Sequence, residues 1–279
     1  MSGQGTQSAG SGQCILVLRV AFFALVVALG AFTGCDDTGN GSTSVVFVSP
    51  RWSPNNSYIA VFSGKADGGT ISGSMDLDLA DLSGRILRRV GSGFASVSSV
   101  EWSPSGSGLE VAQSTGNPVI VDTAGGKVSI GGLEGGTAAD WSPDGTEIIF
   151  AGQGVGDSEA KLYVVNARSG FVSLLNDSLP GGVFAVYWSS AGSIAVLYHR
   201  NYRGYLALLS RSGTDFRILD SVGLVFSSIS WSPDGRGLLY TASAAPYRIY
   251  ELDIASNLRR EVTQRISIQP LFDRGMVTC

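Results

Sequence analysis

The stretch Trp141-Ser142-Pro143-Asp144-Gly145 decides the fold, because the chain repeats it as Trp231-Ser232-Pro233-Asp234-Gly235. Looser copies begin at Trp52, Trp102 and Trp188, so all five tryptophans of the sequence belong to one repeat. Neighbouring copies are 39 to 50 residues apart. A repeat of that length, built from short strands, predicts a radial array of small sheets.

Each copy of the motif is accompanied by four short runs rich in β-branched and aromatic residues, which predict strands. In the third repeat the runs cover residues 137–140, 147–151, 161–165 and 171–175, and Gly, Pro, Asn and Asp separate them. No helical period stands out beyond residue 43. The sequence therefore predicts an all-β chain of four-stranded sheets.

The motif itself has a mechanical explanation. Proline presets its φ angle, aspartate can bond back to the backbone, and glycine accepts a positive φ, so Pro-Asp-Gly predicts a tight turn. The preceding tryptophan would bury its rings between adjacent sheets. We therefore expect the motif to serve packing rather than to bind a ligand.

The first 34 residues have the features of a secretory signal. Arg19 precedes an apolar run over residues 20–30, which is shorter than the roughly 20 residues that a membrane-spanning helix needs. We predict a signal segment over residues 1–34, a flexible Gly-rich tether over 35–43, and one folded domain over 44–279. Cys14 would leave with the signal, so no internal disulfide is expected.

Thr33-Gly34-Cys35 resembles the lipobox of bacterial lipoproteins, although Phe32 stands where leucine is usual. The resemblance implies cleavage before Cys35 and a diacylglyceryl group on its sulfur. It also implies an exported protein that is anchored to a membrane, at the periplasmic face or the cell surface. An ordinary signal peptide with a chance cysteine is the alternative.

The Trp-Ser-Pro-Asp-Gly copies resemble the TolB-type β-propeller repeat, a relative of the WD-repeat family, over residues 44–275. Such proteins usually have six blades. Here five repeats are followed by a fragment, residues 266–279, in which Phe272 stands where the next tryptophan would be. We predict five blades and a partial sixth.

Several functions find no support in the sequence. The formal net charge is −4, without the basic excess that nucleic-acid binding needs. His199 is the only histidine, and no Gly-x-Ser-x-Gly motif accompanies it, so we expect no catalytic residues, no cofactor and no enzyme activity. Asp76 and Asp78 alternate along a predicted strand, which indicates a solvated face or, alternatively, a calcium site. We expect no metal.

Binding is expected on the loops, where rigid scaffolds usually carry recognition residues. One face should combine the predicted loops 63–73, 91–94 and 199–203, and His199, Tyr202 and Arg203 are its best candidates because Tyr and Arg are enriched at binding hot spots. The expected function is a protein-binding scaffold at the cell envelope. A polysaccharide or small-molecule binder using the central channel, and a sialidase- or lyase-type enzyme, are the alternatives. The oligomeric state stays open.

Overall fold

A computed structural model describes residues 32–33, 44–67, 70–71, 73–176, 181–221, 229–242 and 248–263. Cys35, the predicted tether up to residue 43 and the predicted partial sixth blade lie outside the described residues, and so does the predicted signal segment apart from Phe32 and Thr33. The chain divides into two compact units, Met1–Ile130 and Gly131–Cys279. Among the described residues, no helix is both long and apolar enough to cross a membrane.

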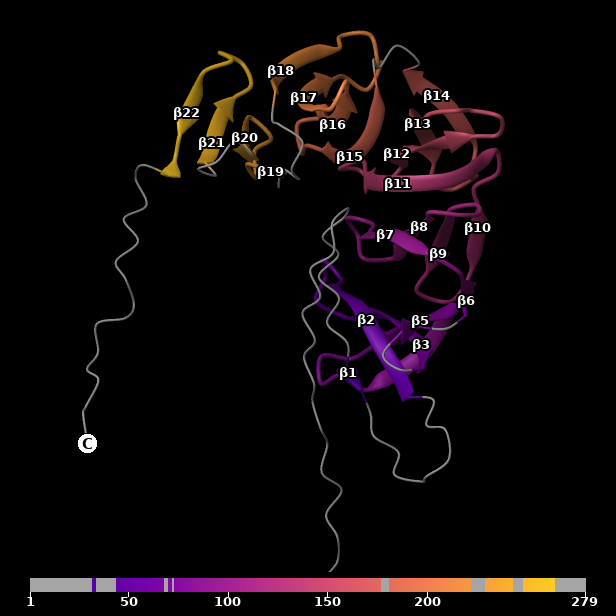
Figure 1. The fold of residues 1–279 in the computed structure, drawn as a ribbon. Helices are drawn as coiled ribbons and strands as arrows, with labels where there is room; N and C mark the ends of the chain where they lie inside the picture. Colours follow the sequence, from indigo (N-terminus) through magenta and orange to yellow (C-terminus); the bar gives the residue numbers. More distant parts are fainter. Residues whose placement is uncertain are drawn as a thin grey trace, which may run out of the picture. The chain divides into compact units, whose positions relative to one another are not determined.

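The first unit contains two antiparallel sheets (Figure 1). In the first sheet the main strands are β2 (Ser44–Trp52), β3 (Ile59–Asp67), β5 (Met75–Ala80) and β6 (Ile86–Phe94). The two-residue strands β1 (Phe32–Thr33) and β4 (Thr70–Ile71) pair with β2 and β3. The second sheet contains β7 (Val97–Trp102), β8 (Gly108–Gln113), β9 (Val119–Asp122) and β10 (Lys127–Ser129). Cleavage before Cys35 would remove β1.

The second unit contains three four-stranded sheets in which each strand pairs with the next along the chain. The third sheet contains β11 (Leu133–Trp141), β12 (Glu147–Gly154), β13 (Lys161–Asn166) and β14 (Val172–Asn176). The fourth contains β15 (Gly182–Trp188), β16 (Ile194–Arg200), β17 (Arg203–Leu209) and β18 (Arg217–Ser221). The fifth contains β19 (Ile229–Trp231), β20 (Gly237–Ala242), β21 (Arg248–Asp253) and β22 (Arg259–Glu261).

The prediction of an all-β chain with five four-stranded units is confirmed. The bounds of one predicted strand and two predicted loops are corrected as follows. β11 covers nine residues, whereas the sequence suggested only 137–140. The predicted loop 91–94 is wrong, because β6 continues to Phe94. Phe94 is buried and its ring lies against Gly91, where an added Cβ would come within 2.7 Å of the ring. The predicted loop 63–73 is wrong in part, because β3 continues to Asp67.

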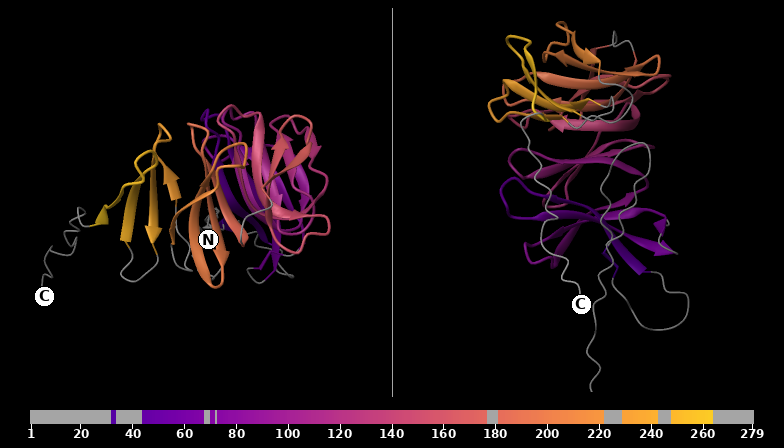
Figure 2. Two further views of the ribbon diagram at one scale, coloured as in Figure 1. Left: turned by 90° about the horizontal axis from the view of Figure 1, so that it is seen from above. Right: turned by 60° about the vertical axis from the view of Figure 1, so that its left-hand side comes forward.

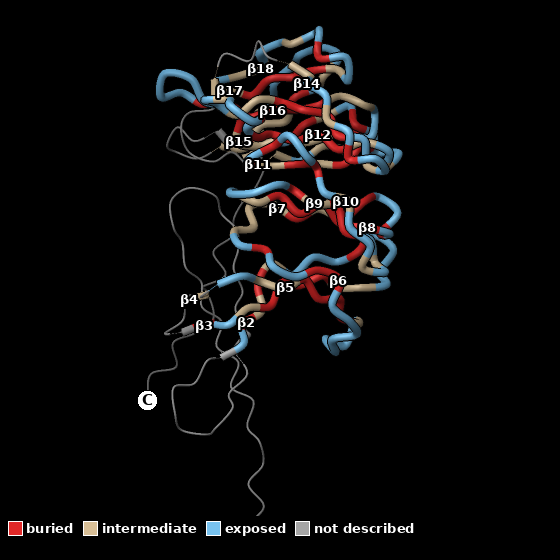
Figure 3. The backbone as a smooth tube through the Cα atoms, turned by 90° about the vertical axis from the view of Figure 1, so that its right-hand side faces the viewer, coloured by how far each residue is buried: buried red, intermediate tan, exposed pale blue. Residues whose placement is uncertain are grey.

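Sheets within each unit pack face to face through apolar side chains. In the second unit the fourth sheet lies between the third and the fifth (Figure 2). Ile194 and Val196 of β16 join a core with the third sheet, while Ala195 and Leu197 of the same strand join a core with the fifth. Both faces of β16 are therefore covered, which explains its continuous apolar sequence. Figure 3 shows that β12 and β16 consist mostly of buried residues.

A serine organises the turn in each copy of the motif, and it is buried in all copies except the last, where Ser232 is half-buried. Ser142 Oγ donates to Asp144 Oδ1 at 2.6 Å and accepts the N–H of Glu147 at 2.9 Å. The predicted turn chemistry is confirmed, because Asp144 accepts the Thr146 N–H and Gly145 has a φ of 71°. The serine, which the sequence analysis did not single out, accepts a backbone N–H four or five residues later in all five copies, at Ser53, Ser103, Ser142, Ser189 and Ser232.

Within the two units, Trp102, Trp188 and Trp231 contact the preceding sheet, as predicted, whereas Trp52 does not bury its rings. Trp102 is only 8% exposed, and its indole N–H donates at 3.1 Å to the carbonyl of Arg51, in the preceding sheet. The Trp231 indole makes the same 3.1 Å bond to the carbonyl of Tyr187. Trp52 is 59% exposed, so the prediction is wrong there. Trp52 belongs to the first sheet of the described residues, and no earlier sheet is described that could cover it.

We predict that Ser142→Ala lowers the free energy of unfolding by about 1–3 kcal/mol, because the substitution leaves the Glu147 amide without its acceptor. Denaturant unfolding of the purified protein measures the effect. Ser158→Ala is the matched control, since Ser158 is exposed and its side chain forms no hydrogen bond within the described residues. Equal stability of both variants would contradict the structural role of Ser142.

The same turn predicts an unusual titration. Hydrogen bonds from the Ser142 hydroxyl, and then from Thr146, lower the pKa of Asp144 from 3.8 to about 2. Because the folded-state pKa lies below the unfolded one, the stabilisation is complete above about pH 4 and is lost as pH falls toward about 2. An NMR titration should show the pKa of Asp144 returning upward in Ser142→Ala. An unchanged pKa would contradict this assignment.

Candidate functional site

The candidate residues lie on the hairpin between β16 and β17. These strands pair without interruption up to Arg200 opposite Arg203, so only Asn201 and Tyr202 form the turn. Their φ angles are 49° and 60°, which is the left-handed conformation that a two-residue type I′ hairpin turn requires. The predicted loop 199–203 is therefore wrong in length, because three of its five residues belong to strands.

Tyr202 occupies a position that favours glycine. A side chain in the left-handed region crowds its own backbone, at a cost of roughly 1–2 kcal/mol. Burial does not offset that cost here, because Tyr202 is 87% exposed. The hairpin thus presents an aromatic side chain in a conformation that stability alone disfavours.

The charges at the tip are also unfavourable for folding. Arg200 and Arg203 are exposed and directly opposite each other, and like charges in that relation destabilise a sheet. Within the described residues, no carboxylate forms an ion pair with either guanidinium. We name Arg200, Asn201, Tyr202 and Arg203 the hairpin tip.

His199 lies beside the hairpin tip. It is exposed, pairs with Gly204 and Gly182, and has its ring so close to Gly182 that an added Cβ would be 2.8 Å from Cε1. Among the described residues, no hydroxyl or carboxylate hydrogen-bonds its imidazole. The structure thus brings His199, Tyr202 and Arg203 onto one hairpin and adds Arg200. The sequence analysis missed Arg200 because Asn-Tyr is not a standard type I′ turn sequence.

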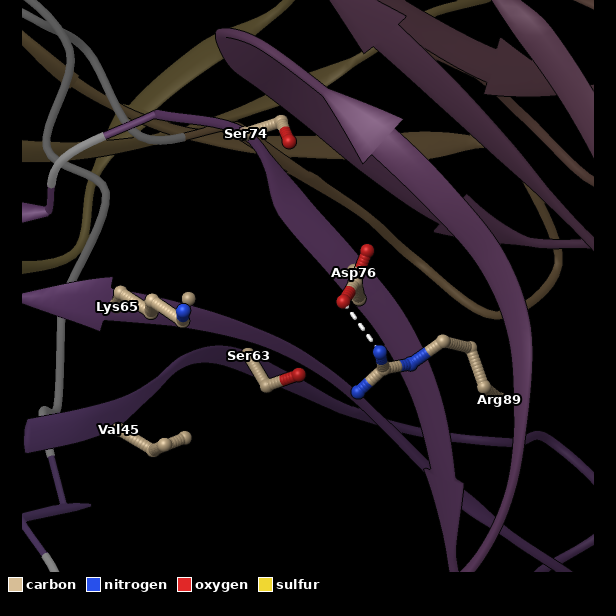
Figure 4. Close-up of a pocket in the computed structure, with 7 residues that line it drawn as sticks. Val45, Ser63, Lys65, Ser74, Asp76 and Arg89 are labelled. Carbon is tan, nitrogen blue, oxygen red and sulfur yellow. Dashed lines mark ion pairs between the residues drawn. The ribbon is translucent and has the colours of Figure 1, made fainter.

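Asp76 and Asp78, which were expected on a solvated face, have a different environment in the structure. Asp78 is only 3% exposed, accepts the Ser63 hydroxyl at 2.5 Å, and accepts Arg89 Nε at 2.9 Å. Arg89 also pairs with Asp76, as Figure 4 shows. A solvated face is therefore wrong for Asp78. The guanidinium already occupies the place of a cation between the two carboxylates.

A cavity of about 410 Å³ adjoins this cluster. Its lining includes Val45, Lys65 and Ser74 besides Ser63, Asp76 and Arg89 (Figure 4). In the part of the chain that the structure describes, no group of three or more His, Cys, Asp or Glu residues could hold a metal ion. The cavity offers side chains of both charges, from Lys65, Arg89 and Asp76.

The comparisons with known proteins identify the fold. No protein-family model and no curated protein match the sequence. TolB from Acinetobacter baumannii superposes with a TM-score of 0.54 and 21% identity, covering 76% of this chain and 53% of TolB. An oligogalacturonate lyase in complex with manganese gives a TM-score of 0.55 and 16% identity, covering 84% of this chain and 72% of the lyase.

The third comparison is a nidogen/laminin complex, with a TM-score of 0.55 and 12% identity, covering 78% of this chain and 78% of that chain. At these identities the likeness concerns the fold alone. Together with the five sheets, it shows that the chain is a β-propeller similar to TolB. The chain spans about half the length of TolB from A. baumannii.

We predict that Tyr202→Gly stabilises the protein by up to about 1 kcal/mol, because glycine relieves the left-handed strain although it adds entropy to the unfolded chain. Tyr202→Ala is the matched control, since it removes the ring and keeps a Cβ in the left-handed region. Denaturant unfolding measures both. A glycine variant no more stable than the alanine variant would contradict strain at this turn.

Proposed function

We propose that this β-propeller is a lipid-anchored, protein-binding module of the bacterial cell envelope, and that the hairpin tip is its recognition element. The proposal assigns no catalysis to the chain. The propeller supplies a rigid scaffold, and the lipid on Cys35 would hold it at the membrane. Binding residues on such scaffolds usually lie where strands connect.

The conformation of Tyr202 is the observation that carries the proposal. Tyr202 is 87% exposed at a φ of 60°, so the chain retains an aromatic ring where glycine would fold better. Two arginines flank it across the hairpin. Tyrosine and arginine dominate binding hot spots, because each combines a large contact area with directed hydrogen bonds. A side chain that weakens folding and is almost fully exposed among the described residues is best explained by a partner.

Two further observations support the proposal. The nidogen/laminin comparison includes a chain of similar fold from a protein–protein complex. The anchor rests on the sequence, where an apolar run over residues 20–30 leads to Thr33-Gly34-Cys35. A lyase activity rests on fold similarity alone, which does not establish function.

Site-specific photo-crosslinking tests the recognition element. The Tyr202 codon is replaced so that p-benzoylphenylalanine, which keeps an aromatic ring, is incorporated in the native host. Illumination should give discrete adducts with one or a few envelope proteins. The control places the same residue at Arg168, in the exposed turn between β13 and β14. Identical adducts from both positions, or none from position 202, would exclude the hairpin tip as the binding element.

The anchor is tested separately with Cys35→Ser. This substitution should abolish incorporation of a labelled fatty acid and move the protein from the membrane fraction to the soluble fraction. Labelling that persists in Cys35→Ser would contradict the lipid assignment and leave the crosslinking result unaffected.

A further inference from the structure

Resting on the proposed function, we infer that the hairpin tip recognises an acidic protein segment, with Arg200 and Arg203 binding carboxylates on either side of the Tyr202 ring. The two arginines are directly opposite residues in the register of the hairpin. A partner that brings negative charge between them would remove the like-charge repulsion that the free protein carries. Binding would thus relieve a cost already present in the fold.

The hairpin tip is distinctive because it places two arginines directly opposite each other, with no carboxylate of the described residues in an ion pair with either. Seven cations form ion pairs with carboxylates, namely Arg85, Arg89, Lys161, Arg211, Arg248, Arg259 and Arg260. Arg200 and Arg203 form no such pair within the described residues. They share this with other cations, such as Lys65 and Arg168, and differ from them in being directly opposite each other in a hairpin. Because the whole chain has a formal charge of −4, an acidic partner would be repelled by much of the protein and attracted to the hairpin tip. The charge distribution therefore also sets the orientation of the partner.

The hairpin tip is held ready for binding. β16 and β17 form seven residue pairs, from Ile194–Leu209 to Arg200–Arg203. Away from the turn the two strands are buried, for example at Val196 and Leu206, while the hairpin tip is exposed. A short turn on a packed hairpin loses little conformational freedom when it binds. Arginine also presents a planar fork of donors that matches a carboxylate.

A protein partner is favoured over an anionic membrane. Segments that bind membranes by charge usually gather about four to eight Lys and Arg residues, whereas the hairpin tip has two. A single tyrosine and a pair of arginines instead match a compact protein hot spot. An anionic lipid surface is an outcome that the experiment can distinguish.

The test uses the purified full domain with immobilised 12-residue peptide libraries of net charge −4, 0 and +4 at equal hydrophobic content. We expect the −4 library to yield the binders, with affinity falling as salt is raised from about 50 to about 200 mM, because salt screens exposed charges. Arg200→Gln and Arg203→Gln should each weaken binding about tenfold or more, and Tyr202→Ala should do the same. Arg168→Gln, an exposed arginine in another turn, should have no effect.

The outcomes separate the inference from the proposed function. Binders of neutral or positive charge that depend on Tyr202 but not on the arginines would overturn the acidic partner and keep the protein-binding role. If none of the observed binding depends on a residue of the hairpin tip, both the acidic partner and the binding role of the hairpin tip are overturned. Vesicles with 30% phosphatidylglycerol provide the lipid arm. Arginine-dependent binding to these vesicles, without any preference among the peptides, would overturn the protein partner in favour of a membrane.

Discussion

The fold depends on the corner at which the first two strands of each sheet meet. There a serine closes the turn, and at two corners the tryptophan beside it reaches the preceding sheet, as the 3.1 Å bonds from Trp102 to Arg51 and from Trp231 to Tyr187 show. The corners also contact one another directly, since Ser190 Oγ donates to the Pro233 carbonyl at 2.7 Å. A five-residue sequence thus specifies both a hairpin and the contact between hairpins.

Much of this architecture could be predicted because each local rule agrees with the global packing. Pro-Asp-Gly favours one tight-turn conformation. Continuously apolar strands such as β16 are stable only when neighbouring sheets bury both of their faces. The exposed Trp52 could not be predicted, because Trp52-Ser53-Pro54 matches the start of the copy at the buried Trp102, and the motif does not reveal which sheet lies beside it. Asp78 was missed for a related reason. Its burial depends on Arg89 in the next strand, and alternation along one strand does not reveal that partner.

The sequence predicted three of the residues at or beside the hairpin tip, but it did not predict the tight turn there. His199, Tyr202 and Arg203 stood out by residue type, but the sequence around Asn201 suggested an open loop. A tight turn with tyrosine at a left-handed position violates the usual turn chemistry, and violations of local rules in otherwise consistent proteins are expected at functional sites. At the corners every residue type suits its conformation, whereas the tip combines strain, exposure and repulsion. This contrast separates the parts of the chain that serve folding from the part that we assign to binding.

Hydrogen exchange of the five indole N–H groups, followed by NMR on the uniformly ¹⁵N-labelled domain, tests the corner account most directly. The account predicts slow exchange for Trp102 and Trp231, whose indoles donate to the preceding sheet, and fast exchange for Trp52, which is 59% exposed. Fast exchange at Trp102 and Trp231, at the rate of Trp52, would contradict it.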